Sequence, residues 1–511
     1  MPSHGAPHRA FAAEHISRSV FANPGVFGRM FPSLPAFEFT DEMLVALNDK
    51  MGADSQEPQN AGGGGPVNPR ILAGFTFLGQ FIDHDITFDP TSSLERQNDP
   101  EAIHNFRTPL LELDNVYGSG PGASPHLYDV STGPRATPVK LLVGLDSNGQ
   151  ENDLPRNRQG TALIGDPRND ENLIISQLHL AFLKFHNRVV DFLAENGNED
   201  GTKPVDNSMW FREAQRVVRW HYQWIIVHEF LPLLVGEPLM AELRSQVEVR
   251  LVGPDPIGNV LDTLKYYRWQ QEPFIPVEFA VAAYRFGHSQ VRAGYIINND
   301  FRALLFPDAP DAPSLFVGRN LVEDAAGHKV LDAKRLVDWA RFNQIPGLEE
   351  AQRQTPPQAG KKIDGKISPS LFTLPSVAPG DPRNPRSLPL RNLMRGRTFS
   401  LPWGQRVAAA MSATVLSDEE LEIGGMGFPE GRAPLWYYIL KEAEVQNEGE
   451  FLGEVGGRIV AEVLLGLLVG DQHSYLTMDP TWKPFLPSAD QGKAFTLGDL
   501  FVFAGVGTVS V

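Results

Sequence analysis

The sequence contains no cysteine in 511 residues. Disulfide bonds, thiolate nucleophiles, iron–sulfur clusters and cysteine-containing zinc sites are therefore all excluded. Long apolar runs are missing as well: the stretches 464–470 and 500–511 are short and rich in glycine, whereas a membrane-spanning helix needs about 20 apolar residues. The first 30 residues also lack the pattern of a signal peptide. We therefore expect no membrane span, and a protein that is cytoplasmic or exported by an unconventional route.

Positively charged residues are fewer than negatively charged ones. The chain has 45 lysine and arginine residues against 62 aspartate and glutamate residues, a formal net charge of −17. A surface of this kind repels nucleic acids and anionic membranes, so we expect neither as a partner. Hydrophobic residues make up 42% and charged residues 21%, which is the composition of a globular protein. The length corresponds to about three ordinary domains or to one large helical unit.

Glycine and proline divide the chain near its start. Residues 1–70 are rich in loop formers and contain the glycine run 62–65, so we expect an N-terminal arm and a flexible linker ahead of one large domain at 71–511. Later segments show apolar residues at helical spacing and few strand patterns, which predicts a mainly α fold. The predicted helices are 75–86, 172–196, 210–234, 276–287, 331–341, 406–416 and 435–466, and a long connector is expected at 355–389.

Two histidines stand in unusual surroundings. At residues 79–85 (GQFIDHD) an apolar helix is interrupted by polar side chains, which are costly to bury without partners. Gln80 and His84 are four residues apart, so both would point into one cavity. His288 follows a glycine at the end of another apolar helix, and that glycine would let a flat ligand approach the backbone closely. Most other histidines, including His179, are interpreted as solvated, capping or core residues.

Four short motifs contain these two histidines. They are G-Q-x-x-D-H-D at 79–85, G-D-x-R-x-x-E at 165–171 with H-N-R at 186–188, R-x-G-H at 285–288 and N-x-x-R-x-R at 392–397. In this order they resemble the motifs of the animal-type haem peroxidases, the peroxidase–cyclooxygenase superfamily, in its bacterial form. The resemblance covers roughly residues 71–410. It implies a mainly α haem peroxidase fold with few short strands, and a single catalytic domain over 71–511 with haem b between a distal and a proximal helix.

The resemblance implies a role for each motif residue. His288 would be the proximal ligand of the haem iron, and Asn392 would accept or orient its N–H group. His84 would take the peroxide proton and return it to the leaving oxygen. Arg168 would stabilise the negative charge that develops as the O–O bond breaks. Gln80 would hold the distal water or a halide.

Further residues would hold the cofactor. Arg285 and Arg395 would pair with the haem propionates. In this family, carboxylates at two positions form ester bonds to haem methyl groups, and these positions are Asp83 and Glu171 here. The methionine that forms a sulfonium link in some relatives is replaced by Asn172. Up to two ester bonds and no sulfonium link are therefore expected.

A calcium site is implied next to the distal histidine. The family binds calcium through the aspartate after that histidine, here Asp85, and through a loop of alternating oxygen ligands. The corresponding loop gives Thr108, Leu110, Glu112 and Asp114 as ligands. Glutamate and aspartate stand here where the family usually has aspartate and serine, which affects the individual ligands more than the ion. The alternative interpretation is a solvated acidic loop.

The motif residues predict an enzyme that uses hydrogen peroxide to oxidise halides or small phenolic donors through a ferryl intermediate, compound I. One alternative is a fatty-acid dioxygenase of the same superfamily, whose radical tyrosine lies three residues before the proximal histidine. That position is Arg285 here, and Tyr284 would be rotated from it by about 100° on a helix, which favours a peroxidase. The other alternative is a haem-free binding protein, against which the retention of the motif residues argues.

Overall fold

The structure is a computed structural model that describes residues 27–53, 67–88, 107–129, 139–204, 206–251, 264–269, 272–307, 309, 311–348, 356–375, 377, 380, 385–488 and 495–507. The helices are α1 (Asp41–Ala53), α2 (Ala73–Ile86), α3 (Asp114–Tyr117), α4 (Leu173–Asn196), α5 (Asn207–Ile225), α6 (Leu231–Val235), α7 (Glu237–Leu251), α9 (Gly287–Gln290), α10 (Leu388–Thr398), α11 (Gly404–Ala410), α12 (Leu435–Asn447), α13 (Glu454–Gly470), α14 (Tyr475–Met478) and α15 (Leu497–Phe503). Short antiparallel pairs are formed by β1 (Val67–Leu72) with β6 (Ala359–Lys361), β2 (Gly294–Ile296) with β3 (Arg302–Leu304), and β4 (Leu321–Glu323) with β5 (Lys329–Leu331). The predicted mainly α fold with few short strands is confirmed.

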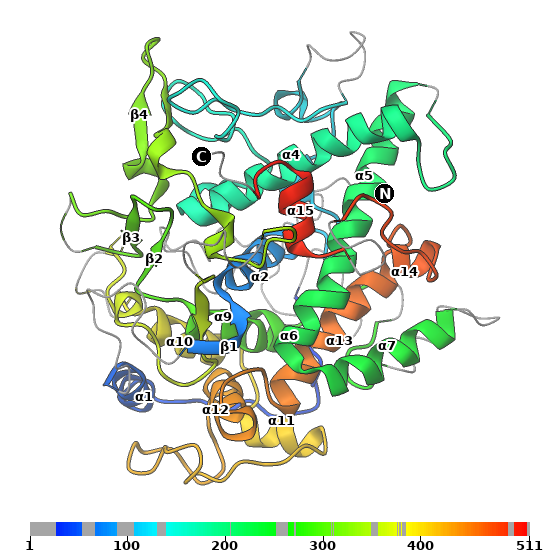
Figure 1. The fold of residues 1–511 in the computed structure, drawn as a ribbon. Coiled ribbons are helices and arrows are strands. Elements are labelled where there is room, and N and C mark those ends of the chain that lie inside the picture. The colour runs from blue at the N-terminus through cyan, green and yellow to red at the C-terminus, as the bar shows by residue number, and fades with distance from the viewer. Residues whose placement is uncertain are drawn as a thin grey trace.

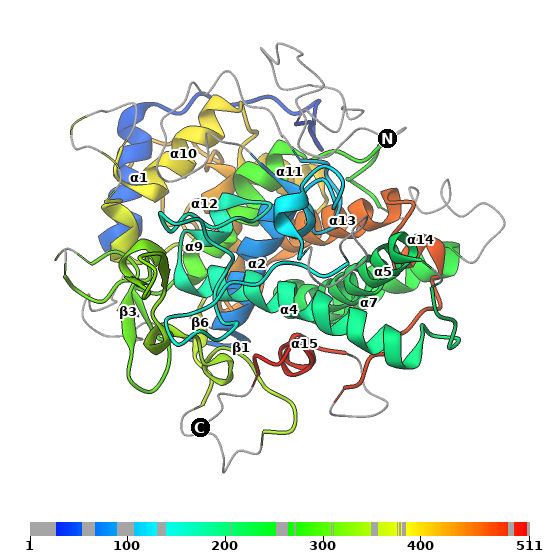
Figure 2. The same ribbon diagram turned by 90° about the horizontal axis from the view of Figure 1, so that it is seen from above.

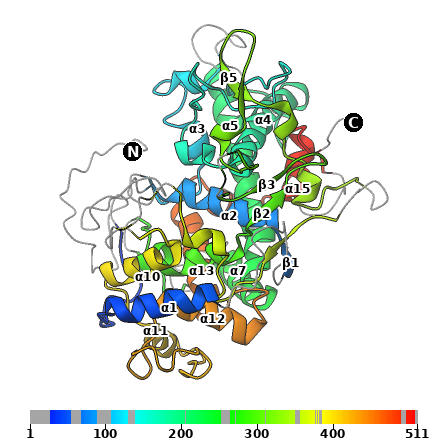
Figure 3. The same ribbon diagram turned by 90° about the vertical axis from the view of Figure 1, so that its left-hand side faces the viewer.

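Helix α2 lies in the middle of the molecule. Figures 1 and 3 show it with α4 and α5 on one side and α10, α12 and α13 on the other. Its apolar side chains, including Phe77, Leu78 and Phe81, are buried, as expected for a helix that is surrounded on all sides. The predicted buried helix at 75–86 is confirmed, and α2 can therefore present polar side chains only to the interior.

The long helices α4 and α5 pack against each other, and α4 covers one side of α2. Helix α4 begins where the Asn172 side chain accepts a hydrogen bond from the N–H of Ile175, which is an N-cap. It ends at Gly197, whose φ of 81° only glycine adopts readily. Helix α5 continues through one π turn, Ile226–Phe230, into α6. The predicted helices at 172–196 and 210–234 are confirmed.

On the other side of α2, the predicted helix at 276–287 is irregular. A π turn at Glu278–Ala282 is followed by a 3₁₀ turn at Ala283–Phe286 and then by α9. The change occurs at Ala282, whose φ and ψ are −127° and −73°. Such π turns are frequent at functional sites, and this one determines the direction in which the R-x-G-H motif faces.

The prediction of a helix at 331–341 was wrong. Leu331 ends strand β5, and the chain continues in two 3₁₀ turns, Ala333–Arg335 and Trp339–Arg341. The side chains of Asp332 and Asp338 each accept a hydrogen bond from the N–H two residues further on. These local bonds compete with the bonds of an α-helix.

Two other predicted helices have different limits in the structure. The segment 435–466 consists of the two helices α12 and α13, because the chain turns at Glu448, whose φ is 52°. Helix α11 ends at Ala410, whereas the sequence predicts a helix over 406–416. Ser412, with a φ of 54°, cannot continue it.

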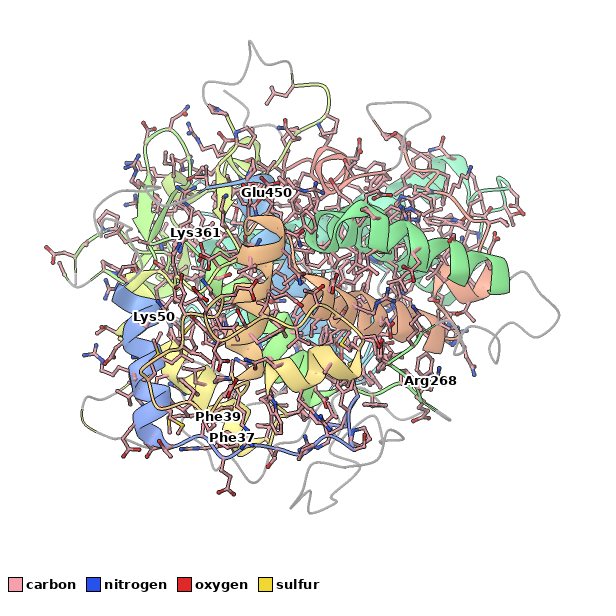
Figure 4. The ribbon with its side chains drawn as sticks, turned by 90° about the horizontal axis from the view of Figure 1, so that it is seen from below. Phe37, Phe39, Lys50, Arg268, Lys361 and Glu450 are labelled. Carbon is pink, nitrogen blue, oxygen red and sulfur yellow. The ribbon has the colours of Figure 1, made fainter. Side chains whose placement is uncertain are left out.

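The described part of the predicted N-terminal arm, residues 27–53, contributes to the same hydrophobic core as the rest of the chain. Leu44 and Leu47 of α1 are fully buried, and α1 runs beside α10 (Figure 2). Figure 4 shows Phe37 and Phe39 next to each other ahead of α1, with ring centroids 5.0 Å apart. The first 26 residues and the glycine run 62–65 lie outside the described residues.

A buried carboxylate ties this segment to the proximal side of the molecule. Glu278, in the π turn, accepts hydrogen bonds from the N–H groups of Met30 at 3.0 Å and Phe31 at 3.1 Å. Residues 27–53 therefore pack on the element that carries the R-x-G-H motif. None of the helices that the structure describes is long and apolar enough to cross a membrane.

Candidate active site

The G-Q-x-x-D-H-D motif places His84 on α2 with one ring nitrogen already bonded. His84 Nδ1 lies 2.6 Å from Asn169 Oδ1, and Asn169 Nδ2 lies 3.0 Å from His179 Nδ1. Because an amide oxygen can only accept, His84 Nδ1 is the donor in the first bond. The lone pair of His84 is therefore on Nε2. His179 is a hydrogen-bonded core residue, as its sequence context predicts.

Burial keeps the His84 ring neutral. Burial, together with the nearby Arg168 guanidinium, lowers the pKa of His84 to about 3. The side chain is 5% exposed, so the bond to Asn169 is made away from bulk water. A neutral imidazole with a free lone pair can accept a proton at neutral pH.

Arg168 is held beside His84 by a buried carboxylate. Its Nη2 lies 2.8 Å from Asp166 Oδ2, and it also donates to the backbone oxygens of His84 at 3.2 Å and Thr87 at 2.5 Å. The guanidinium lies over the ring of Phe88 at 5.0 Å. The G-D-x-R-x-x-E motif is thereby fixed to the C-terminal end of α2, and the positive charge of Arg168 is placed next to the distal histidine.

The remaining residues predicted on this side lie around the same end of α2. Gln80 Oε1 is 3.4 Å from Asn172 Nδ2. Burial raises the pKa of Asp83, while the charges of Arg168 and Arg285 act in the opposite direction. Since Arg285 belongs to the R-x-G-H motif, both the distal and the proximal motifs act electrostatically on this one carboxylate.

The proximal motif and the N-x-x-R-x-R motif meet at His288. Asn392 Nδ2 lies 2.7 Å from His288 Nδ1, and Arg285 Nη1 donates to Asn392 Oδ1 at 3.1 Å. We expected Asn392 to accept or orient the N–H of His288. Asn392 Nδ2 faces His288 Nδ1, while the Arg285 guanidinium donates to the amide oxygen, so Asn392 lies where it can orient the ring. Burial and the charges of Arg285 and Arg395 lower the pKa of His288 to about 3.

Several residues that were predicted to contact the haem are partly exposed although they come from central elements, whereas His84 and Arg168 are buried. The partly exposed group comprises Gln80, Asp83, Glu171, Arg285, Gly287 and His288. Their neighbours Asn169 and Asn392, which hold the two histidines, are sealed at 0% and 1% exposure. A Cβ built on Gly287 would meet no atom within 4 Å. These side chains are therefore accessible to a flat cofactor.

The predicted calcium ligands are brought together only in part. Asp114 N–H donates to Asp85 Oδ1 at 3.1 Å, and Thr108 Oγ1 donates to Glu112 Oε1 at 2.8 Å. Asp85 is fully buried, and its Oδ2 has no hydrogen-bond partner among the described residues. Burial and the neighbouring Asp114 carboxylate raise the pKa of Asp85 well above its usual range. These observations fit a cation beside Asp85. Leu110, whose N–H bonds the Thr108 oxygen at 2.8 Å, lies in the turn between them.

An arginine side chain already neutralises part of the negative charge around Asp85 and Asp114. Arg107 lies 2.8 Å from Asp114 Oδ1 and 2.7 Å from Asp166 Oδ2, and Arg219 lies 3.5 Å from Glu112 Oε2. No group of three or more His, Cys, Asp or Glu side chains in the described part of the chain is arranged to hold a metal ion.

Sequence reasoning missed Asn169 and Arg107. Asn169 follows Arg168 on a 3₁₀ turn, Pro167–Asp170, that begins at the side chain of Asp166. Its spacing from the two histidines in the sequence carries no signal, since they come from different helices. Arg107 directly precedes the predicted calcium loop, and a basic residue just ahead of Glu112 and Asp114 was the available indication.

Part of the chain is similar to a known protein family. Residues 92–310 match the family model for animal haem peroxidases. This part of the chain is similar to the animal haem peroxidases. Among known proteins, the chain is 25% identical over 460 residues to thyroid peroxidase of Mus musculus, covering 74% of this chain and 43% of that protein. It is 28% identical over 257 residues to chorion peroxidase of Aedes aegypti, covering 48% of this chain and 28% of that protein. The chain thus spans less than half the length of these relatives.

Solved structures agree on the animal haem peroxidase fold. Peroxidase A of Dictyostelium discoideum matches with a TM-score of 0.57 and 14% identity, over 97% of this chain and 95% of the other. The fatty acid alpha-dioxygenase of Oryza sativa matches with a TM-score of 0.54 and 15% identity, over 99% and 85%. At this identity the likeness concerns the fold alone, and it includes both a peroxidase and a dioxygenase.

Proposed function

We propose that this protein is a haem-dependent peroxidase that reduces hydrogen peroxide and oxidises small donors, namely halides or small phenols. The observation that carries the proposal is the paired orientation of two neutral histidines. Asn169 fixes the Nδ1 of His84, and Asn392 contacts the Nδ1 of His288. One histidine can then move protons while the other can ligate iron.

On the distal side, the residues of the chain would handle the peroxide. His84 Nε2 accepts the proton of the bound peroxide oxygen and returns it to the leaving oxygen, so that water departs rather than hydroxide. Arg168, held by Asp166, stabilises the negative charge on that oxygen. Gln80, whose amide is oriented by Asn172, holds the distal water or a halide. Bound haem would supply the two-electron redox chemistry.

On the proximal side, His288 would be the iron ligand, with its other nitrogen held by Asn392. Arg285 and Arg395 would pair with the haem propionates, because their charges already act on His288. Asp83 and Glu171 would form the ester links to haem. These roles rest on the resemblance to the animal haem peroxidases and on the positions of the side chains.

A calcium ion beside Asp85 is proposed as a further component. It would bind the unpartnered Asp85 oxygen together with Thr108, Leu110, Glu112 and Asp114. Since Asp85 directly follows His84, the ion would hold the end of α2 in place.

A fatty-acid dioxygenase is the second candidate, and the structural likeness to alpha-dioxygenases favours keeping it. The position of Tyr284 weighs against it. The Tyr284 hydroxyl donates to the backbone oxygen of Gly79 at 3.2 Å, and its ring stacks on Phe279 with centroids 4.7 Å apart. A hydroxyl tied to the α2 backbone is poorly placed to take part in hydrogen abstraction from a lipid.

The test is rapid mixing of the haem-loaded protein with hydrogen peroxide, followed by bromide, iodide, thiocyanate, tyrosine or linoleate. We expect fast peroxide consumption with a halide or phenol and slow reaction with linoleate. His84→Ala should keep haem and slow the peroxide reaction by roughly 10²–10⁴-fold, the usual cost of losing a general base. A rate within about twofold of the unmodified protein would refute the role of His84.

A further inference from the structure

His179 is a buried histidine whose ring bonds a neighbour of the distal histidine. It lies on α4, is 0% exposed, and its Nδ1 is 3.0 Å from Asn169 Nδ2. Asn169 is the only hydrogen-bond partner of this ring among the residues that the structure describes, because Nε2 has none. A buried nitrogen without a partner costs free energy, and an apolar side chain would avoid that cost. The bond to Asn169 is therefore what this ring contributes and an apolar residue could not.

The backbone around Asn169 is fixed independently of His179. The turn Pro167–Asp170 begins at the side chain of Asp166, and Arg156 donates to both carboxylate oxygens of Asp170 at 2.7 and 2.9 Å. These bonds leave open which end of the Asn169 amide faces which histidine, since a half-turn of the amide exchanges its oxygen and its nitrogen. The two histidine rings that contact the amide determine that choice.

With both rings neutral, one arrangement of protons fits the two bonds of the amide. Asn169 Oδ1 accepts, so His84 carries its proton on Nδ1, and Asn169 Nδ2 donates, so His179 has its lone pair on Nδ1. Burial lowers the pKa of His179 to about 3, which keeps this lone pair available. If the amide turned over, its N–H would face His84, whose proton would then lie on Nε2. His84 would thereby lose the lone pair that accepts the peroxide proton.

We propose that His179 is a positioning residue of the distal side, which accepts from Asn169 and so keeps the amide oxygen on His84 Nδ1 and the lone pair on His84 Nε2. This inference rests on the proposed peroxidase function and adds to it a residue that acts only through another side chain. Loss of His179 therefore changes the place of the proton on His84 without removing His84, Arg168 or Gln80 from the site.

The test replaces His179 by side chains that separate its volume from its acceptor. In His179→Asn the amide oxygen takes the place of Nδ1 and still accepts from Asn169, although the side chain is smaller. His179→Gln is closer to histidine in size, but its oxygen lies near the place of Nε2. His179→Leu has no acceptor. A role in filling space favours Gln and Leu over Asn, whereas a positioning role favours Asn.

The first measurement is the place of the proton on His84 in the full chain without haem. Nitrogen NMR of isotope-labelled histidine distinguishes a protonated from an unprotonated ring nitrogen, and the His84 signal is the one that His84→Ala lacks. The unmodified protein and His179→Asn should carry the proton on Nδ1. His179→Gln and His179→Leu should carry it mainly on Nε2, because turning the amide over relieves a buried N–H that has lost its acceptor.

The second measurement is the peroxide reaction of the haem-loaded protein. We expect His179→Leu to slow it by about 10- to 100-fold, the change in population that corresponds to one buried donor without an acceptor. His179→Asn should react nearly as fast as the unmodified protein. The matched control is His186→Leu. His186 lies on the same helix and is equally buried, but its ring contacts Tyr117 and Val139, so this variant should melt at a lower temperature and change neither measurement.

Two results would overturn the proposal. One is a folded His179→Leu protein in which His84 keeps its proton on Nδ1 and the peroxide rate is unchanged. The other is a His179→Gln protein that matches the unmodified protein in both measurements while His179→Asn does not, which would mark His179 as a residue that fills space. Failure of the haem-loaded unmodified protein to react with peroxide would instead refute the proposed function, and the place of the proton in the haem-free chain would still decide the role of His179.

Discussion

Asn169→Asp is the change that tests the distal side most directly. It keeps the size of the side chain and replaces a neutral acceptor of His84 by an acid. A hydrogen bond to a charged group is worth about 1.5–3 kcal/mol and a neutral one about 0.5–1.5 kcal/mol. The gain of roughly 1 kcal/mol corresponds to nearly one pKa unit, and direct attraction between the two charges at an effective dielectric constant of about 20 can raise it to about three units.

The sign of the effect follows from the low pKa of His84, which is about 3 in the unmodified protein. The peroxide reaction needs the neutral ring, so its rate should be flat from pH 8 down to about pH 4. In Asn169→Asp the ring should become charged between about pH 4 and pH 6, and the rate should fall through that range. The assay is the second-order rate constant of the peroxide-induced spectral change, measured against pH.

Asn187→Asp is the control, since it makes the same chemical change on α4, where Asn187 bonds only the Leu141 backbone. Its pH profile should match that of the unmodified protein. The reasoning would be refuted if Asn169→Asp kept its haem and its melting temperature but its rate did not fall between pH 4 and pH 6. In that case Asn169 would not hold His84 Nδ1, and the conclusion that the lone pair is on Nε2 would fail.

His288→Ala should bind haem weakly or not at all, because no other histidine of the chain follows an R-x-G motif; full haem content with an unchanged spectrum would disprove the ligand assignment. Chelation of calcium should slow the peroxide reaction by disturbing the end of α2, and Asp85→Asn should make the protein insensitive to the chelator. Metal analysis that finds no calcium in protein purified without chelator would indicate that Arg107 supplies the cation alone. Mass spectrometry after peroxide treatment should find haem attached through Asp83 or Glu171, and haem that extracts completely would rule out both esters.

The sequence predicted the features of the fold and site that depend on residues close together in the chain. The motif at 79–85 sits on one buried helix, so its spacing alone shows that Gln80 and His84 share a face. The cap at Asn172 and the stop at Gly197 are local signals too, and α4 was predicted to the residue at its C-terminal end. The fold class followed from such helices.

What the sequence could not supply depends on contacts between distant segments. Asn169 and His84 are 85 positions apart in the sequence, and the residues next to Asn169 in the chain do not indicate that bond. Arg285 donates to the Asn392 amide oxygen from 107 positions away, so the way in which Asn392 faces His288 could not be inferred from the motif that contains it. The helix predicted at 331–341 was wrong for a local reason. The side chains of Asp332 and Asp338 accept hydrogen bonds from the backbone and end each turn early.

The bond between Glu278 and the backbone of Met30 and Phe31 has a practical consequence for dissecting the protein. A chain cut to begin at residue 71 would follow the boundary suggested by the glycine run, yet it would strip two N–H donors from a fully buried carboxylate. Such a fragment would have an unsatisfied carboxylate in the turn that precedes His288. Residues 27–53 added back as a separate peptide would restore those two donors and the packing of α1 on α10. Haem binding by the fragment should then depend on the added peptide.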